Sequence, residues 1–86
     1  MSIPLNVDTI MQFPEGTYLK VIFYNGSYGI GTLTFDYDYD DGELQPYFNK
    51  IVGPKLVEDR TRWCISLYKN YFVITKAEAF KLILEF

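Results

Sequence analysis

Five carboxylates fall within eight positions near the middle of this sequence, and they are the side chains with the clearest chemical potential. They are Asp36, Asp38, Asp40, Asp41 and Glu43. The chain has 8 basic and 11 acidic residues, so eight bases against the six remaining acids leave the rest of it at +2. No Lys or Arg lies between Lys20 and Lys50. The net charge of −3 therefore conceals a local negative potential, which steers and orients basic partners.

A calcium site is one chemistry that a row of carboxylates suggests. An EF-hand loop that starts at Asp36 would place Asp41 where the loop needs glycine, and Tyr47 where it needs the final bidentate Glu. The absence of His and of Cys pairs removes the common zinc patterns as well. We therefore assign no metal to the segment.

Two interpretations of the acidic segment remain. In one, the carboxylates keep an exposed edge strand from pairing with other chains. In the other, they form a face that meets a basic partner. Same-face residues of a strand stand about 6.5–7 Å apart, close to the roughly 6–7 Å between phosphates along one nucleic-acid strand. A row such as Asp36, Asp38 and Asp40 can thus mimic phosphates.

Tyrosines near the acidic segment would add contact area to such a face. Three of them lie within or just after it, namely Tyr37, Tyr39 and Tyr47. Tyrosine is enriched at protein interfaces because it combines a large ring with a polar tip. These features predict a non-enzymatic protein-binding module, an inhibitor of a basic-surfaced protein that handles nucleic acid. Phage anti-defence proteins and immunity proteins share this physical character. The chain itself is not expected to bind nucleic acid directly.

The alternative function is that of a homo-oligomer that binds or sequesters a small ligand such as a nucleotide. A chain of 86 residues has little volume for a private pocket, so the site would lie between subunits. Tyrosines would stack on the base, and basic side chains would hold the phosphate. The residues assigned to this site are Tyr24, Tyr28, Lys50, Lys55, Arg60 and Arg62. The first two, with Tyr18, are expected on an exposed face of the sheet.

Other chemistries lack the residues that they need. The sequence has no His and a single Cys, so Cys64 has no imidazole to activate it and is expected to be a buried thiol. Gly26, Gly29 and Gly31 lie within a predicted hairpin rather than before a helix, which argues against a phosphate-binding loop. We expect no enzymatic activity and no cofactor. The sequence begins without a secretory signal and has no apolar run near 20 residues, so a cytoplasmic location without membrane contact is expected.

Strands must position these residues, because stretches rich in β-branched and aromatic residues alternate with turn signals along most of the chain. The expected strands cover residues 17–24, about 28–40, 44–52, 62–68 and 71–74. Pro46 is expected to shorten the third strand. A turn at Lys69-Asn70 would pair the last two, with Ile65 opposite Ile74. Residues 1–13 fit either an edge strand or one helical turn.

The acidic segment lies at the far end of a predicted hairpin whose turn is Asn25-Gly26. A two-residue loop would put the apolar residues of its two strands on opposite faces. A three-residue loop with Gly26 in a bulge gathers them on one face, and we favour it because burial selects the register. It is expected to place Gly29 and Gly31 opposite Phe23 and Val21.

A helix is predicted to begin after Thr75, because Thr75-Lys76-Ala77-Glu78 is a capping box. Apolar residues at spacings of three and four should turn toward the sheet, and these are Ala77, Phe80, Ile83 and Leu84. The length of 86 residues predicts a single domain, 1–86. The expected fold is α+β: a small, strongly twisted antiparallel sheet of four to six strands, open or closed into a partial barrel, with one C-terminal helix.

Overall fold

The computed structural model describes residues 3–4, 7–23, 26–37, 40, 42–53, 62–65 and 70–86. These residues form six strands and two helices. The elements are β1 (Ile3–Pro4), α1 (Val7–Ile10), β2 (Tyr18–Ile22), β3 (Tyr28–Tyr37), β4 (Leu44–Val52), β5 (Arg62–Cys64), β6 (Asn70–Val73) and α2 (Lys76–Ile83). The strands form one sheet in the order β1-β6-β2-β3-β4-β5, and every neighbouring pair is antiparallel. The predicted α+β fold is confirmed.

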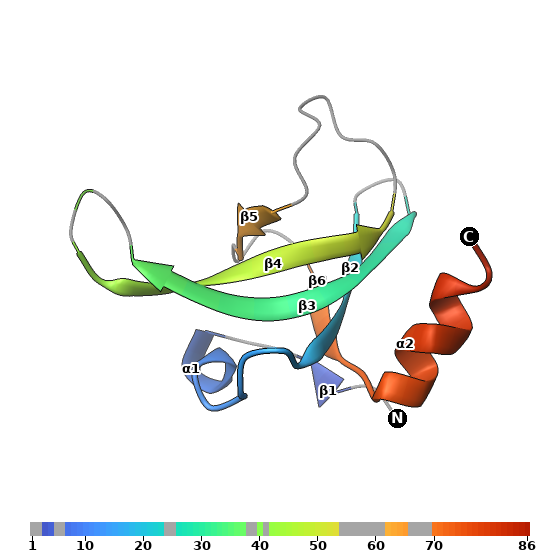
Figure 1. Ribbon diagram of the computed structural model, residues 1–86, viewed down its shortest axis with the longest axis horizontal. Coiled ribbons are helices and arrows are strands. Elements are labelled where there is room, and N and C mark those ends of the chain that lie inside the picture. The colour runs from blue at the N-terminus through green and yellow to red at the C-terminus, as the bar shows by residue number, and fades with distance from the viewer. Residues whose placement is uncertain are drawn as a thin grey trace.

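Four longer strands form the body of an open sheet, and the short β1 and β5 pair with its two outer strands. Figure 1 shows β2 and β6 crossing steeply behind the long β3–β4 pair, which is the strong twist expected of a small antiparallel sheet. The start of the chain combines both structures that the sequence allowed. Its first described residues add an edge strand, and α1 follows as a single turn.

In the β2–β3 hairpin, the side chains point to the faces that a three-residue loop predicts. The residues that pair across the two strands differ from the prediction. The N–H of Phe23 donates to the carbonyl of Ser27 at 2.9 Å, and the N–H of Gly26 donates to Phe23 at 3.0 Å. This closure sets Gly29 opposite Val21, and Gly31 opposite Leu19, two residues away from the expected partners. A shift of two keeps every side chain on the predicted face, because side chains alternate.

Gly31 allows the sheet to close over its core. A Cβ atom built on Gly31 would lie 2.2 Å from the carbonyl oxygen of Asn49 and 2.8 Å from the ring of Phe48. Real Cβ atoms do not approach other atoms so closely, so a side chain here would force β3 and β4 apart. The ring of Phe48 occupies this space and is fully buried.

The main core lies on the face of the sheet that α1 covers. Its buried residues are Ile10, Leu19, Val21, Leu33, Phe48 and Tyr71. The last two bring their ring centroids within 5.9 Å. Ile10 places α1 against this face, below the strands in Figure 1. Phe13, Phe23 and Phe35 pack around the edge of the cluster, as the aromatic content predicts for a small domain.

A second cluster lies on the other face, beneath α2. It consists of Ile30, Ile74 and Ala79, with Tyr18 and Tyr28 half-buried against it. The prediction that these two tyrosines are exposed is therefore wrong, because α2 covers the part of the sheet that carries them. The helix begins where predicted, since the hydroxyl of Thr75 accepts the N–H of Glu78 at 3.1 Å.

The inward face of α2 differs from the predicted one. Ala79 is fully buried, and Leu82 and Ile83 lie partly buried beside it. Phe80 touches the sheet only at its side, edge to face with Tyr18 at 5.9 Å between ring centroids, and is 48% exposed. Leu84, which was also expected to face the sheet, is 85% exposed. The small Ala79 lets the helix approach the sheet closely, and this contact decides the rotation of α2. Within the described residues, neither helix is long and apolar enough to cross a membrane.

Two further expectations about strands are wrong. β4 continues for nine residues through Pro46 because the missing N–H of this proline would point away from β3. On that outer side, its carbonyl accepts the N–H of Ile65. β5 therefore pairs with β4, whereas it was expected to pair with β6. Ile74, which was expected opposite Ile65, instead donates its N–H to the carbonyl of Tyr18. Cys64 is exposed rather than buried, because it lies on this edge strand.

Candidate functional site

The far half of the β3–β4 hairpin extends beyond the rest of the sheet. β2 pairs with residues 28–32 of β3, whereas residues 34–37 pair with residues 44–47 of β4. Figure 1 shows this part of the hairpin projecting at one end of the molecule, away from α2. We call residues 34–47 the hairpin arm. The difference in length between β2 and β3, five residues against ten, is what creates it.

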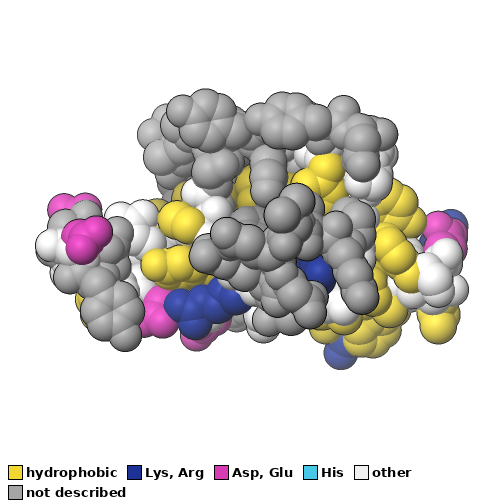
Figure 2. Space-filling model, turned by 90° about the horizontal axis from the view of Figure 1, so that it is seen from above, with side chains coloured by type: hydrophobic (Ala, Val, Ile, Leu, Met, Phe, Trp, Pro, Cys, Tyr) yellow, Lys and Arg dark blue, Asp and Glu magenta, His cyan; other side chains and the backbone are white. Residues whose placement is uncertain are grey.

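The acidic segment occupies the arm and its tip. Asp36 lies in β3, and Asp40 and Glu43 are exposed at the end of the hairpin. Figure 2 shows acidic side chains gathered at this end of the molecule. Asp38 and Asp41 lie outside the described residues. Gly42, with a φ of 70°, has the left-handed backbone that glycine readily adopts near the tip of a hairpin.

Asp36 has a basic neighbour, Arg62, on the adjacent part of the sheet. The Nη2 atom of Arg62 donates to its Oδ2 atom at 2.6 Å, and the guanidinium carbon lies 4.5 Å from the ring centre of Tyr47. The N–H of Tyr37 donates to the Oδ1 atom of Asp36 at 2.8 Å. These hydrogen bonds, first that of Arg62, hold the pKa of Asp36 below its ordinary value. Arg62 thus balances the charge of Asp36, and the other described acids of the segment, Asp40 and Glu43, lie nearer the tip of the arm.

Glu15 also contacts the arm, a role that no sequence pattern indicated. Its Oε1 atom accepts hydrogen bonds from the hydroxyl of Thr34 at 2.5 Å and from the N–H of Phe35 at 3.2 Å. These bonds lower the pKa of Glu15. The contact depends on the turn after Pro14, whose carbonyl accepts the N–H of Thr17, and on a register that no local pattern reveals.

Carboxylates therefore cap the open edge of β3. The N–H of Leu33 donates to the carbonyl of Thr17, so the N–H groups of Phe35 and Tyr37 point toward the same edge. Glu15 accepts the first of these and Asp36 the second. An uncapped edge would offer both donors to a strand of another chain. These two contacts agree with the edge-protecting interpretation for the strand before the tip.

Apolar side chains at the end of the arm give it contact area. Tyr37 is 68% exposed, and Leu44, directly opposite in the β3–β4 register, is 43% exposed. Leu44 was not among the predicted site residues, because an isolated leucine in a strand normally indicates core. Tyr47 is half-buried and lies nearer the root, under Arg62, and Tyr39 lies outside the described residues. Tyr37 and Leu44 are thus the described apolar contact points beside the acidic tip.

The three described residues of the alternative nucleotide site lie apart from one another within the chain. Tyr28 contacts Phe86 edge to face with centroids 5.1 Å apart, and Lys20 lies over its ring at 4.8 Å. Lys50 pairs with Gly31 in the sheet, which puts it on the face opposite Tyr28. Arg62 contacts Asp36. The remaining members, Tyr24, Lys55 and Arg60, lie outside the described residues.

A small cleft separates α2 from β2 and β6, and it is the candidate pocket for a small molecule. It measures about 150 Å³, below the roughly 300–1,000 Å³ of usual ligand pockets. Its lining residues are Lys20, Ile22, Phe72, Ile74, Glu78 and Leu82. Among the described residues, no three His, Cys, Asp or Glu side chains cluster in a way that could hold a metal ion.

The candidate site is thus a projecting hairpin with an acidic tip and two exposed apolar side chains. Comparisons of the chain with protein-family models, with curated proteins and with solved structures found no match.

Proposed function

We propose that this chain is a non-enzymatic inhibitor that inserts its hairpin arm into the basic nucleic-acid-binding surface of another protein in the cytoplasm. The observation that carries the proposal is the coincidence of shape and charge. The arm projects beyond the sheet, and the acidic segment, from Asp36 onward, falls in its outer part. A projecting hairpin can enter a groove that a flat surface cannot reach.

Charge placement supports this proposal. Arg62 balances the negative charge of Asp36 within the arm. The four acids beyond Asp36 have no base near them in the sequence, since no Lys or Arg occurs between Lys20 and Lys50. A concentrated negative end raises the rate of encounter with a basic surface and orients the arm as it arrives.

Exposed apolar groups supply the second part of the interaction. Buried aromatic and aliphatic anchors, rather than charges at the rim of an interface, usually give most of the binding energy. Tyr37 and Leu44 lie opposite each other at the end of the arm and are both exposed. In this proposal they fill the bottom of the partner's groove, while Asp40 and Glu43 meet its Lys and Arg side chains.

Capture of proteins from the native host on immobilised chain tests the proposal. The wild type should retain a basic nucleic-acid-binding protein, and raising the salt concentration should release it because exposed charges are screened. The double variant Asp40→Asn/Glu43→Gln should retain at most about one tenth as much at low salt. The control Glu58→Gln/Asp59→Asn removes the same charge elsewhere in the sequence and should bind like the wild type.

The measurement that identifies inhibition is a competition. Addition of the wild-type chain should displace a labelled oligonucleotide from the captured protein, and the tip variant should not. Equal capture by both double variants would exclude the arm as the binding site. Capture without displacement would show that the chain binds the protein elsewhere than on its nucleic-acid surface.

A further inference from the structure

α2 carries a second apolar stripe that faces solvent. Its inward side is formed by Ala79, Leu82 and Ile83. Phe80, whose ring meets that of Tyr18 edge to face at one side, is still 48% exposed, and Leu84, the residue that ends the helix, is 85% exposed. Ala77, one turn before Phe80, is exposed on the same side of the helix. Large apolar side chains with spacings of three and four on an exposed side are typical of a helix that packs against another helix.

Charges on one flank of the stripe are suited to a second copy of the same helix. Lys81 follows Phe80 in the last turn of α2, and Glu85 follows Leu84 in the turn that continues the helix, where its N–H donates to the carbonyl of Leu82 at 3.1 Å. Both therefore lie on the same flank of the stripe. A pair of antiparallel helices related by a two-fold axis brings equal flanks together. A flank with one base and one acid is then complementary to itself, since each Lys81 faces the Glu85 of the other copy.

We propose that two copies of this chain associate through α2, packed antiparallel about a two-fold axis near Leu82. An axis at that level puts Phe80 opposite Leu84 of the other copy, because each lies two positions from Leu82. At 1.5 Å per residue, Lys81 and the other copy's Glu85 are then about 3 Å apart along the axis, within reach of an ion pair. The two-fold axis makes each of these contacts twice.

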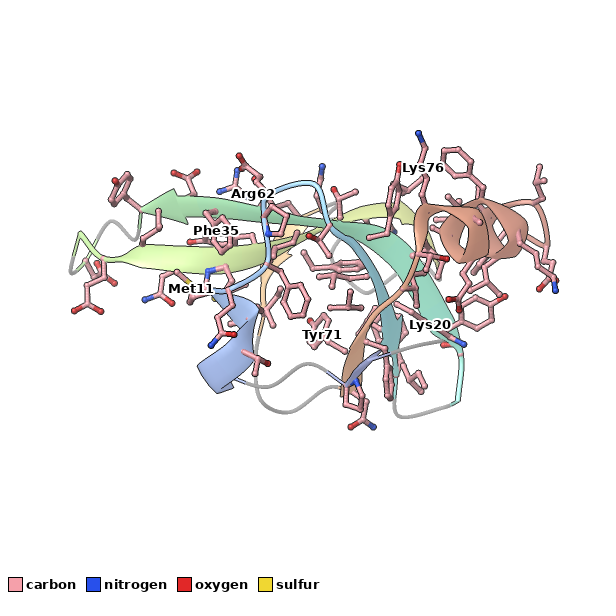
Figure 3. All side chains as sticks on the ribbon, turned by 90° about the horizontal axis from the view of Figure 1, so that it is seen from below. Met11, Lys20, Phe35, Arg62, Tyr71 and Lys76 are labelled. Carbon is pink, nitrogen blue, oxygen red and sulfur yellow. The ribbon has the colours of Figure 1, made fainter. Side chains whose placement is uncertain are left out.

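The size of the stripe sets the strength of the association. α2 has 8 residues, so the contact is short and buries less than the roughly 1,200 Å² of the smallest stable interfaces. Two copies should therefore form a transient dimer at high protein concentration. Figure 3 shows Lys76 pointing away from the body at the start of α2. Figure 1 shows α2 at the end of the molecule opposite the hairpin arm. A dimer made this way leaves both arms free.

Sedimentation equilibrium over a concentration series up to about 1 mM tests the proposal, since even a very weak complex is visible there. The wild type should change from monomer to dimer with concentration. Leu84→Ser should lower the association constant at least about ten-fold, and it should not affect folding because this side chain packs against little in its own chain. The control Leu44→Ser makes the same change on the arm and should dimerise like the wild type.

Charge reversals test the antiparallel arrangement. Lys81→Glu and Glu85→Lys should each lower the association constant about ten-fold, since each replaces two attractive pairs with two repulsive ones. The double variant Lys81→Glu/Glu85→Lys should restore it, whereas a different arrangement predicts no restoration. A wild type that stays monomeric at the highest concentration overturns the proposal, as does a dimer that Leu84→Ser leaves intact. Neither result bears on the arm, whose partner is tested separately.

Discussion

Single side chains decide which parts of the arm can pair with another chain. Glu15 and Asp36 accept the two N–H groups that the edge of β3 would otherwise expose, at Phe35 and Tyr37. Both carboxylates are exposed, so the value of these contacts lies in protecting an edge rather than in large stabilisation.

The Glu15 contact makes a prediction about pH. The pKa of Glu15 in the folded chain lies below its ordinary value of 4.5, mainly because Thr34 donates to it. The ionised carboxylate therefore favours the folded state, and this contribution is fully present above about pH 5 and is lost as the pH falls through the folded pKa. Glu15→Gln should be less stable than the wild type at pH 7 and equally stable near pH 2. Urea unfolding at a series of pH values measures the difference.

Thr34→Val serves as the control for this effect. It removes the donor that contributes most to lowering the pKa of Glu15 but leaves the carboxylate in place. Its stability should depend on pH less steeply than that of the wild type over the same acidic range. If Glu15→Gln and the wild type kept the same difference at pH 7 and pH 2, the contact would have no electrostatic part.

At the scale of elements, the rotation of α2 is the feature with the sharpest consequence. The helix packs through Ala79 at its closest point to the sheet, whereas Ala77 faces solvent. The same substitution at these two alanines therefore probes opposite surroundings. Ala79→Leu should cost about 1–3 kcal/mol, because an added side chain must force the helix from the sheet. Ala77→Leu should change the free energy of unfolding by less than about 0.5 kcal/mol. Thermal and urea unfolding compare the two, and a reversed order would favour the rotation first predicted.

Local patterns in the sequence predicted several elements because each depends on neighbouring residues. Alternation in residues 17–24 and about 28–40 predicted the two strands that the structure gives as Tyr18–Ile22 and Tyr28–Tyr37. The capping box at Thr75 predicted the start of α2. The choice between the two hairpin facings was also correct, since only one facing buries Leu19 and Leu33 together.

Long-range contacts explain the wrong predictions. Phe80 and Ala79 are neighbours in sequence, and hydrophobicity favours the larger side chain for the inward position. The close approach of α2 to the sheet selects the smaller one instead. In the same way, β5 pairs with β4 rather than with β6, a choice that depends on the whole order of strands. The role of Glu15 depends on a contact twenty positions away, so no local motif could have revealed it.

Over the whole molecule, stabilising and exposed residues occupy different regions. The main core lies where β2, β3, β4 and β6 meet, and the acidic arm and the apolar stripe of α2 lie at opposite ends (Figure 1). Such a division lets the arm change in sequence at little cost to folding.

Variants of the arm and of the core test this division. Tyr37→Ser/Leu44→Ser should lower the free energy of unfolding by no more than about 1 kcal/mol, since both side chains are exposed. Phe48→Ala removes a fully buried ring and should lower it by about 3–5 kcal/mol. That loss is a large part of the total for a small domain, which is about 5–15 kcal/mol. Comparable losses from the two variants would show that the end of the arm belongs to the core.

Gly31 has a consequence for how relatives of this chain can be recognised. Any side chain there would meet the carbonyl of Asn49 and the ring of Phe48, so a sequence with this fold must keep a glycine at that point in its third strand. Exposed positions such as Tyr37 carry no such steric constraint and are free to diverge. A glycine in the third strand, facing an aromatic residue in the fourth, is therefore a signature that outlasts overall similarity between sequences.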